Sequence, residues 1–406
     1  MHRQHRGILM RHLLTLSSSF LLLACQAAAP PSSETAQQVS HQDTRAQVAE
    51  AASGSENSQF QFKEAFKEHF FMGTALSKEQ ILGDKKIQAL VSEQFNALTA
   101  ENEMKWERIN PEPGIYDWQT ADALVEYSQR HNMFTTGHTL VWHQQVPDWV
   151  FKDNTAQQAP AALLTQRMKH HIETVVGRYK GKIQSWDVVN EAFRDDGSYR
   201  KSSWFKILGP DYIETAFKLA HAADPEAKLY YNDYNLWKPE KRDSVVRMVK
   251  NLKQKGITIH GIGMQGHYGL NHPENLQYIE DAIVAFHQLG VDVMVTELDI
   301  TVIPFPDSEN QGADISLNIE LQEKYNPYPN GLSEEAQQAF DRRYSDVFKV
   351  FVKHSDKLHR ITFWGVHDAQ SWRNGWPIKG RTDYPLLIDR DLKVKPVAKS
   401  LLSSSR

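Results

Sequence analysis

The sequence predicts an α/β fold in which residues 60–406 form a single (β/α)8 barrel of the TIM type. Eight short apolar runs alternate with segments of helical period, as in parallel strands joined by helices. All 10 tryptophans lie between Trp106 and Trp376, and no polar linker follows residue 60. An open, doubly wound sheet is the alternative. It would carry a glycine-rich phosphate turn after its first strand, and Met72-Gly73-Thr74-Ala75 is not such a turn.

The predicted strands share a high content of apolar and β-branched residues and are bounded by Gly, Asn or Asp. They are Phe70–Leu76, Phe95–Glu101, Phe134–Trp142, Ser185–Glu191, Lys228–Asp233, Ile259–His267, Val291–Glu297 and Ile361–Val366. Apolar residues spaced three and four apart predict helices at Leu163–Tyr179, Asp243–Lys255, Ala282–Leu289 and Glu335–Phe351. The carboxyl ends of the strands should meet at one end of the barrel, where active sites of this fold lie.

We expect residues 1–24 to be a lipoprotein signal peptide. Arginines without any acidic residue come first, and the apolar stretch Leu13–Ala24 that follows is too short to span a bilayer. The segment ends in Leu22-Leu23-Ala24-Cys25, which resembles the bacterial lipobox, and Cys25 is the single cysteine of the chain. We therefore expect Cys25 to be lipidated and to become the first mature residue. The alternative is a general secretory signal with an incidental cysteine.

We expect residues 25–59, which begin with the lipidated Cys25, to be a disordered tether. The segment after Cys25 is rich in Ala, Ser, Gln and Glu and contains no aromatic residue, Leu or Ile, so it cannot bury enough apolar surface to fold. Gln26 stands where an Asp would favour inner-membrane retention in some bacteria. We therefore expect an outer-membrane lipoprotein of a Gram-negative bacterium, or a secreted protein if the lipobox is not used.

The charge of the chain excludes some classes of partner. A formal net charge of −4 and a pI near 6.5 give no basic face for a nucleic acid. We expect contact with a membrane only through the N-terminal lipid, and we expect a monomer.

Two carboxylates stand out among the polar residues that end the predicted strands. Glu191 ends the fourth strand and Glu297 ends the seventh, so the two lie across the barrel mouth from each other. Two carboxylates that flank a glycosidic bond are the minimum equipment for its hydrolysis. The amides, imidazoles and indoles at the other strand ends suit a sugar, whose hydroxyls need donors and acceptors and whose faces lie on aromatic rings. For either glutamate alone, a solvated charge or a salt bridge is the alternative.

Six segments, in order along the chain, carry a family resemblance. They are Thr99–Trp106, Gly137–His143, Trp186–Ala192, Tyr231–Asn235, Gly263–His267 and Thr296–Asp299. Together they closely resemble glycoside hydrolase family 10, the endo-β-1,4-xylanases, over essentially all of residues 60–403. The resemblance implies hydrolysis of internal β-1,4 bonds of xylan and xylo-oligosaccharides by double displacement, with retention of anomeric configuration. It implies no metal and no cofactor.

The resemblance also implies a role for individual residues. Glu191 is the expected general acid/base and Glu297 the expected nucleophile, with carboxyl groups about 5–5.5 Å apart as in retaining enzymes. His267 and Asp299 are expected to orient the nucleophile. The expected sugar-binding residues are Glu101, Asn102, Lys105, His138, Trp142, Asn190, Tyr234, Gln265, Trp364 and Trp372. His138 and His143 lack a third ligand at a defined spacing, which also argues against a zinc site.

The sequence contains two long loops of expected function, and it is compatible with two alternative functions. The segments 304–333 and 374–386 are long, and we expect them to shape the cleft for xylan side chains or for oligosaccharides. An endo-β-1,4-glucanase is one alternative, although the C6 hydroxymethyl group of glucose should be crowded by Trp364 and Trp372. A surface xylan-binding protein of low or no activity is the other, although such a protein usually lacks one of the two carboxylates.

Overall fold

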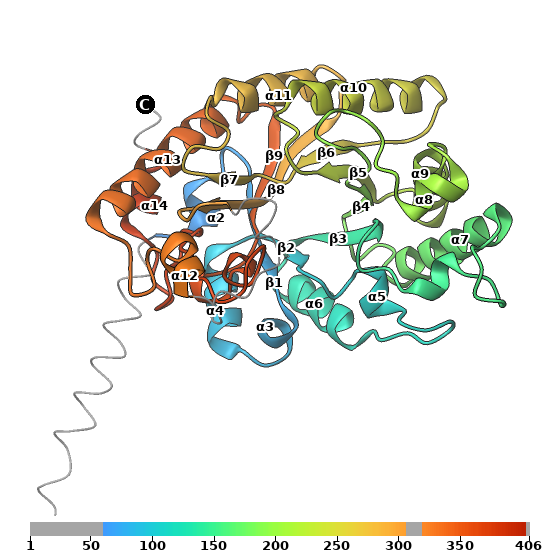
Figure 1. Ribbon diagram of the computed structural model, residues 1–406, viewed down its shortest axis with the longest axis horizontal. Coiled ribbons are helices and arrows are strands. Elements are labelled where there is room, and N and C mark those ends of the chain that lie inside the picture. The colour runs from blue at the N-terminus through green and yellow to red at the C-terminus, as the bar shows by residue number, and fades with distance from the viewer. Residues whose placement is uncertain (1–59, 306–318, 403–406) are drawn as a thin grey trace, which may run out of the picture. The chain divides into compact units, whose positions relative to one another are not determined.

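Eight parallel strands close into a barrel at the centre of the fold, which confirms the predicted fold class (Figure 1). The computed structural model describes residues 60–305 and 319–402. The barrel strands are β1 (Phe71–Leu76), β2 (Ala97–Ala100), β3 (Phe134–Val141), β4 (Ser185–Asn190), β5 (Lys228–Asp233), β6 (Gly261–Met264), β8 (Asp292–Thr301) and β9 (Leu358–Phe363). Residues 1–59, which hold the expected signal peptide, the tether and Cys25, lie outside the described residues, as does 306–318 of the first long loop.

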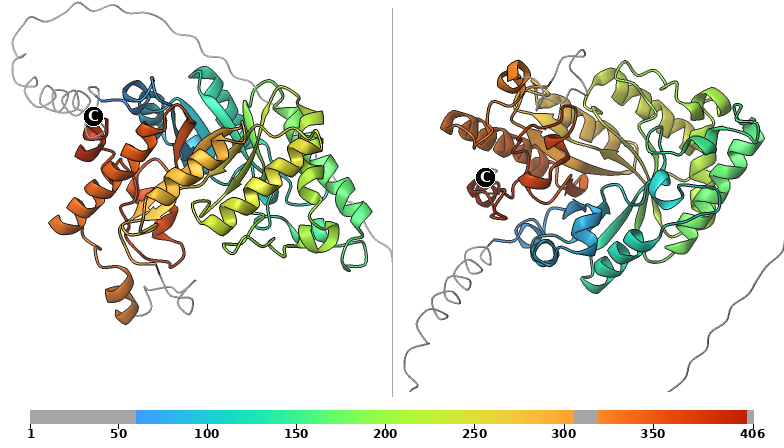
Figure 2. Two further views of the ribbon diagram at one scale, coloured as in Figure 1. Left: turned by 90° about the horizontal axis from the view of Figure 1, so that it is seen from above. Right: turned by 60° about the horizontal axis from the view of Figure 1, so that its bottom comes forward.

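Two pairings between strands that are not consecutive in the chain close the barrel. The first strand pairs with the last, with Phe71 opposite Arg360 and Met72 opposite Ile361. Consequently the red C-terminal elements lie beside the blue N-terminal ones in both views of Figure 2. The second pairing joins β6 to β8 and skips the short strand between them in sequence. Nearly every residue of these strands is buried, because helices cover the outside of the parallel sheet.

The predicted sixth strand, Ile259–His267, is not continuous. It divides into β6 and the short strand β7 (His267–Gly269), with Gly266 between them at a φ of +83°. A side chain is strained in this left-handed conformation, and a Cβ atom on Gly266 would also lie 2.7 Å from Val295 Cγ1. The break lets β7 pair with the end of β8, which is longer than predicted, and sets His267 opposite Asp299.

Helices lie outside the strands (Figure 1). They are α2 (Phe62–Ala65), α3 (Lys78–Leu82), α4 (Lys85–Gln94), α5 (Trp106–Ile109), α6 (Gln119–Arg130), α7 (Ala161–Arg178), α8 (Ser203–Leu208), α9 (Tyr212–Ala223), α10 (Pro239–Gln254), α11 (Gln277–His287), α12 (Ile319–Tyr325), α13 (Glu334–Lys353) and α14 (Pro396–Ser400). In α13, Phe340, Tyr344, Val347 and Phe351 are buried at spacings of three and four. Among the described helices, none combines the length and the apolar character that a membrane crossing requires.

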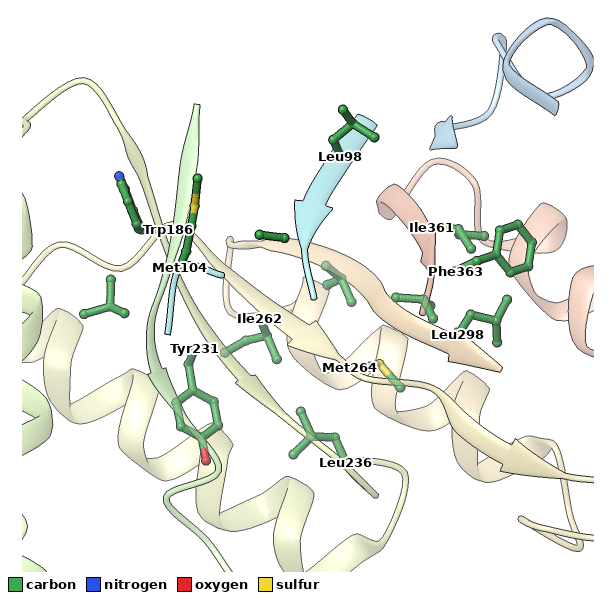
Figure 3. Close-up of a cluster of buried hydrophobic side chains, with 14 of the residues drawn as sticks. Leu98, Met104, Trp186, Tyr231, Leu236, Ile262, Met264, Leu298, Ile361 and Phe363 are labelled. Carbon is green, nitrogen blue, oxygen red and sulfur yellow. The ribbon is translucent and has the colours of Figure 1, made fainter. Parts of the chain in front are cut away.

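The core between strands and helices joins side chains from all around the barrel. Trp186, Tyr231, Ile262, Leu298 and Phe363 come from five different strands and are all buried (Figure 3). The indole ring of Trp186 packs against Gly137 of the neighbouring strand β3. A Cβ atom at Gly137 would lie 2.1 Å from this ring. The packing therefore requires glycine at this position.

Candidate active site

A cleft of about 630 Å³ lies at the carboxyl ends of the barrel strands. Almost all the predicted site residues line it. They are Glu101, Asn102, Lys105, His138, Trp142, Asn190, Glu191, Tyr234, Gln265, His267, Glu297, Trp364 and Trp372. Asp299 is the exception, because it lies behind the cleft wall and contacts His267 and Trp372. The structure thus brings together side chains that are as far as 271 positions apart in sequence only by closing the barrel.

Glu297 is buried at the floor of the cleft, and two side chains hold its carboxylate. Asn232 Nδ2 donates to Oε1 at 2.7 Å, and His267 Nε2 lies 3.1 Å from Oε2. Burial favours the neutral acid and would raise the pKa of Glu297. The hydrogen bond from His267, the charges of His138 and His267 and the hydrogen bond from Asn232 act in the opposite direction. Together they outweigh burial and lower the pKa of Glu297 below its ordinary value. Glu297 is therefore an ionised carboxylate at neutral pH, as a nucleophile must be.

The orientation of His267 is set by a second carboxylate. Its Nδ1 lies 3.0 Å from Asp299 Oδ2. Asp299 accepts two further bonds from Arg373, at 3.1 Å from Nε and 2.8 Å from Nη2, and one at 2.7 Å from Trp372 Nε1. Burial opposes ionisation of Asp299, yet Arg373 and His267 lower its pKa to about 2. Burial would likewise deprotonate His267, but Asp299 and the bond to Glu297 raise the pKa of the imidazole to about 9.

Glu191 directly follows β4 and is held mainly through its backbone. Its φ is +57°, which is uncommon for a residue other than glycine. Three contacts enforce this conformation: the Glu191 N–H donates to Asn232 O at 2.9 Å, the Glu191 carbonyl accepts from Arg200 Nε at 3.0 Å, and the next N–H, that of Ala192, donates to Tyr231 Oη at 3.0 Å. These contacts fix the point from which the side chain enters the cleft.

The Glu191 carboxylate has one firmly bonded oxygen. Gln265 Nε2 donates to Oε1 at 3.1 Å. His143 Nδ1 lies 4.0 Å from the other oxygen, Oε2, and among the described residues no hydrogen bond to Oε2 is formed. Burial lowers the pKa of His143 to about 4, so this imidazole is neutral at pH 7. One carboxyl oxygen of Glu191 is therefore available to a substrate.

The side-chain amides of Asn232 and Asn190 lie next to each other beside Glu297. Asn232 accepts at 2.6 Å from Thr296 Oγ1, which orients its amide so that Nδ2 faces Glu297. Asn190 is best satisfied with its nitrogen 3.0 Å from the Asn232 carbonyl and its oxygen 3.3 Å from Trp142 Nε1. A sugar between Glu191 and Glu297 would thus meet a rigid set of polar groups.

On another wall of the cleft, a lysine lies among aromatic rings and carboxylates. Lys105 Nζ donates to Asn102 Oδ1 at 2.9 Å and lies 4.8 Å from the centre of the Trp142 ring. Burial lowers the pKa of Lys105 and raises that of Glu101 to about 7. His138 Nδ1 lies 2.9 Å from Asp187 Oδ2, which leaves the other ring nitrogen for the cleft. The polar groups of this wall can form several hydrogen bonds with the hydroxyl groups of a sugar.

Several cleft residues were not among the predicted site residues. Gln144, Gln145, Asn235, His272, Phe305, Arg373 and Trp376 line the cleft, and Asn232 bonds to Glu297. Asn232 could have been found, because it lies in the Tyr231–Asn235 segment at the end of a predicted strand. Asn235 ends the same segment and Arg373 lies in a 3-10 turn at Trp372–Asn374. The remaining residues lie on loops, where no periodic pattern indicates which way a side chain points. In the part of the chain that is described, no group of three or more His, Cys, Asp or Glu side chains could hold a metal ion.

Comparisons with known proteins agree with this geometry. The family described as glycosyl hydrolase family 10 matches residues 61–404. An endo-1,4-beta-xylanase A of Xylanibacter ruminicola is 50% identical over 341 residues, which is 84% of this chain and 92% of the relative. A beta-1,4-xylanase of Dictyoglomus thermophilum is 41% identical, over 81% of this chain and 86% of the relative.

Solved structures are also similar to this chain, both in fold and in sequence. A GH10 endoxylanase retrieved from a sugarcane soil metagenome superimposes with a TM-score of 0.79 at 43% identity, over 85% of this chain and 99% of the other. A mutant structure in complex with xylotriose superimposes with a TM-score of 0.76 at 35% identity, over 84% and 99% of the two chains.

Proposed function

The chain belongs to glycosyl hydrolase family 10, and we propose that it is an endo-1,4-β-xylanase in which Glu297 is the nucleophile and Glu191 the general acid/base. The observation that carries the assignment of roles is the difference between the two carboxylates. Glu297 is fixed and kept ionised by Asn232 and by the protonated His267. Glu191 keeps one oxygen without a hydrogen bond from the described residues, as a group that passes a proton to and from the substrate must.

The reaction follows as two displacements at one anomeric carbon. In the first, a Glu297 carboxylate oxygen forms a bond to the anomeric carbon while the bond to the leaving oxygen breaks, and Glu191 gives its proton to that oxygen. In the second, the ionised Glu191 takes a proton from water, and the water oxygen replaces Glu297 on the carbon. Because each step inverts the configuration, the product retains that of the substrate.

The surrounding residues supply the binding energy for the sugar chain. Asn190 is next to the acid/base, where a hydrogen bond to the 2-hydroxyl would strengthen in the transition state. Glu101, Asn102, Lys105 and His138 offer donors and acceptors on one wall. Trp142, Trp364 and Trp372 offer the ring faces on which pyranoses lie, Gln265 holds Glu191, and Tyr234 also lines the cleft.

Anomer-resolved NMR of the products from xylan tests the reaction. We expect the β-anomer to form first from the wild type, and we expect Glu297→Ala to lose at least ~10³-fold in kcat. Glu112→Gln, an exposed change outside the cleft, is the matched control and should retain full activity. Initial formation of the α-anomer would overturn the mechanism. A 10-fold preference for glucan would favour the glucanase, and binding of xylan without release of reducing ends would favour a binding protein.

We also propose that Cys25 is lipidated and anchors the barrel through residues 25–59 as an outer-membrane lipoprotein. This proposal rests on the basic and apolar character of residues 1–24 and on the position of the single cysteine. Fractionation of cells that express the full chain, with mass spectrometry of the mature N-terminus, tests it. The wild type should be found in the outer membrane, and Cys25→Ser should be released or left unprocessed. Normal anchoring of Cys25→Ser would contradict the proposal and leave the catalytic assignment unaffected.

A further inference from the structure

Strand β5 supports both carboxylates of the site, one from each of its two faces. Successive side chains of a strand point to opposite faces, and the Asn232 side chain points toward the cleft, where its Nδ2 donates to Glu297. Tyr231 and Asp233 therefore point the other way, and both are fully buried (Tyr231 is labelled in Figure 3). On this face Tyr231 contacts the backbone of the residue that follows Glu191.

The peptide group that joins Glu191 to Ala192 is held at both of its polar atoms. Its carbonyl oxygen accepts from Arg200 Nε at 3.0 Å, and its N–H donates to Tyr231 Oη at 3.0 Å. Because a peptide group is planar, these two hydrogen bonds fix its rotation and with it the ψ angle of Glu191. The φ angle of +57° persists only where the surroundings enforce it, so the direction of the Glu191 side chain depends on these contacts.

The Tyr231 hydroxyl is prepared to accept the hydrogen bond from Ala192. It donates its own proton to Asp233 Oδ2, and burial raises the pKa of the phenol well above its ordinary value, so the hydroxyl stays protonated. Burial raises the pKa of Asp233 to about 6, and Lys241 limits the rise, so Asp233 is ionised at pH 7. A hydroxyl that donates to a carboxylate is polarised and becomes a better acceptor.

Lys241 of α10 joins this strand to the loop that follows the acid/base. Its Nζ lies 2.7 Å from Asp233 Oδ1 and 3.6 Å from Asp195 Oδ1, and the lysine is fully buried. A buried ion pair is weak evidence of stability by itself, since apolar packing of the same volume is often as stable. This pair instead forms the start of a buried chain of contacts that passes through Tyr231 and ends at the peptide after Glu191.

We propose that Tyr231 is a positioning residue for the acid/base, because its hydroxyl holds the peptide that follows Glu191 and so aims the Glu191 carboxyl group at the leaving oxygen. The Asp233–Lys241 pair fixes the hydroxyl in turn. The inference rests on the proposed function, in which Glu191 protonates that oxygen. Tyr231 does not line the cleft, so it acts on proton transfer through Glu191 and not on the binding of the sugar.

Two substrates test the proposal on the full-length enzyme at pH 7. One is an unsubstituted xylo-oligosaccharide, whose leaving oxygen must be protonated, and the other is a dinitrophenyl xylobioside, whose phenolate leaves without a proton. In both cases kcat/KM reports the steps up to formation of the glycosyl-enzyme. We expect Tyr231→Phe to lower kcat/KM about 10- to 100-fold on the oligosaccharide and less than about twofold on the dinitrophenyl glycoside. A general loss of structure would lower both.

Two further variants frame this result. Glu191→Ala removes the acid itself, and we expect it to lower kcat/KM at least ~10²-fold on the oligosaccharide with little change on the dinitrophenyl glycoside. Tyr268→Phe is the matched control, since it removes another buried hydroxyl, one that lies outside the cleft and has no hydrogen bond among the described residues. It should leave both values of kcat/KM unchanged.

A double variant carries the test if Tyr231→Phe does not fold. Asp233→Asn/Lys241→Met removes both charges together and keeps an acceptor for the Tyr231 proton. Because the hydroxyl is then less polarised, we expect a loss in kcat/KM of about two- to fivefold on the oligosaccharide alone. An equal loss on both substrates would contradict the inference.

The outcomes separate this inference from the function on which it rests. If Tyr231→Phe loses kcat/KM equally on both substrates, or on neither, while Glu191→Ala loses it on the oligosaccharide alone, the inference is overturned and the proposed function stands. If Glu191→Ala loses kcat/KM equally on both substrates, Glu191 is not the acid, and both proposals fail.

Discussion

His267 Nε2 lies 3.1 Å from Glu297 Oε2, and Nδ1 of the same ring lies 3.0 Å from Oδ2 of Asp299. Only a protonated imidazole can donate from both nitrogens. One imidazolium therefore bridges two buried carboxylates, and Arg373 supplies the second positive charge that the pair requires. This arrangement keeps the proposed nucleophile ionised.

The first prediction concerns the pH dependence of stability. The pKa of His267 is about 9 in the folded chain and ordinarily 6.5, so its protonated form contributes stability fully below pH 6.5 and loses it as the pH rises through 9. We expect the free energy of unfolding of the wild type, relative to His267→Gln, to fall by about 1–3 kcal/mol between pH 6 and pH 10. Urea unfolding at both pH values measures it. A difference that stays constant would show that the imidazolium does not bridge the carboxylates.

The second prediction concerns the buried pair beneath the Glu191 loop. Asp233 Oδ1 lies 2.7 Å from Lys241 Nζ, both side chains are fully buried, and Tyr231 Oη donates to the other Asp233 oxygen. Asp233→Ala leaves the buried lysine charge with only the more distant Asp195, whose Oδ1 lies 3.6 Å from Lys241 Nζ, and should cost about 3–5 kcal/mol in the free energy of unfolding. Adding Lys241→Met should recover part of the loss. The exposed Asp243→Ala is the control, and it should change stability by less than about 1 kcal/mol. A single variant as stable as this control would refute the interpretation.

The third prediction concerns the close contact between Gly137 and Trp186. Gly137→Ala places a Cβ atom 2.1 Å from the indole ring, so we expect a loss of about 1–3 kcal/mol or more and a lower Tm. Gly177→Ala provides the contrast, since nothing lies within 4 Å of its Cβ position in α7. It should instead stabilise the protein by about 0.5–1 kcal/mol, because alanine favours the helix. Thermal unfolding of both variants measures the two changes in Tm, and a Gly137→Ala variant as stable as the wild type would contradict the prediction.

The fourth prediction concerns an exposed tryptophan at the edge of the cleft. Trp376 lines the cleft and yet is 55% exposed, as suits a ring face that binds a sugar. We expect Trp376→Ala to raise KM about three- to tenfold on long xylo-oligosaccharides with little change in kcat, because a distal sugar contributes equally to ground and transition states. Trp376→Phe should restore part of the affinity. An equal effect on the shortest cleaved substrate would place the ring at the bond that is cleaved.

Much of the fold could be predicted because strands and helices leave periodic patterns. The strand ends were predicted to within a few residues, and the closed-barrel fold was confirmed. The sixth strand was the exception, since Gly266 breaks it and no periodicity indicates a glycine with positive φ. Glu191 and Glu297 could be selected because each follows an apolar run, and parallel strands bring such ends together.

The sequence by itself determined the order of the elements, the two carboxylates and the family, because these depend on local patterns and motifs. Only the tertiary structure decided which loop residues complete the site. Arg373 reaches Asp299 across 74 positions, and Arg200 links the Glu191 carbonyl to Tyr234. Such contacts arise from the packing of irregular segments onto a closed barrel, and that packing leaves no periodic pattern in the chain.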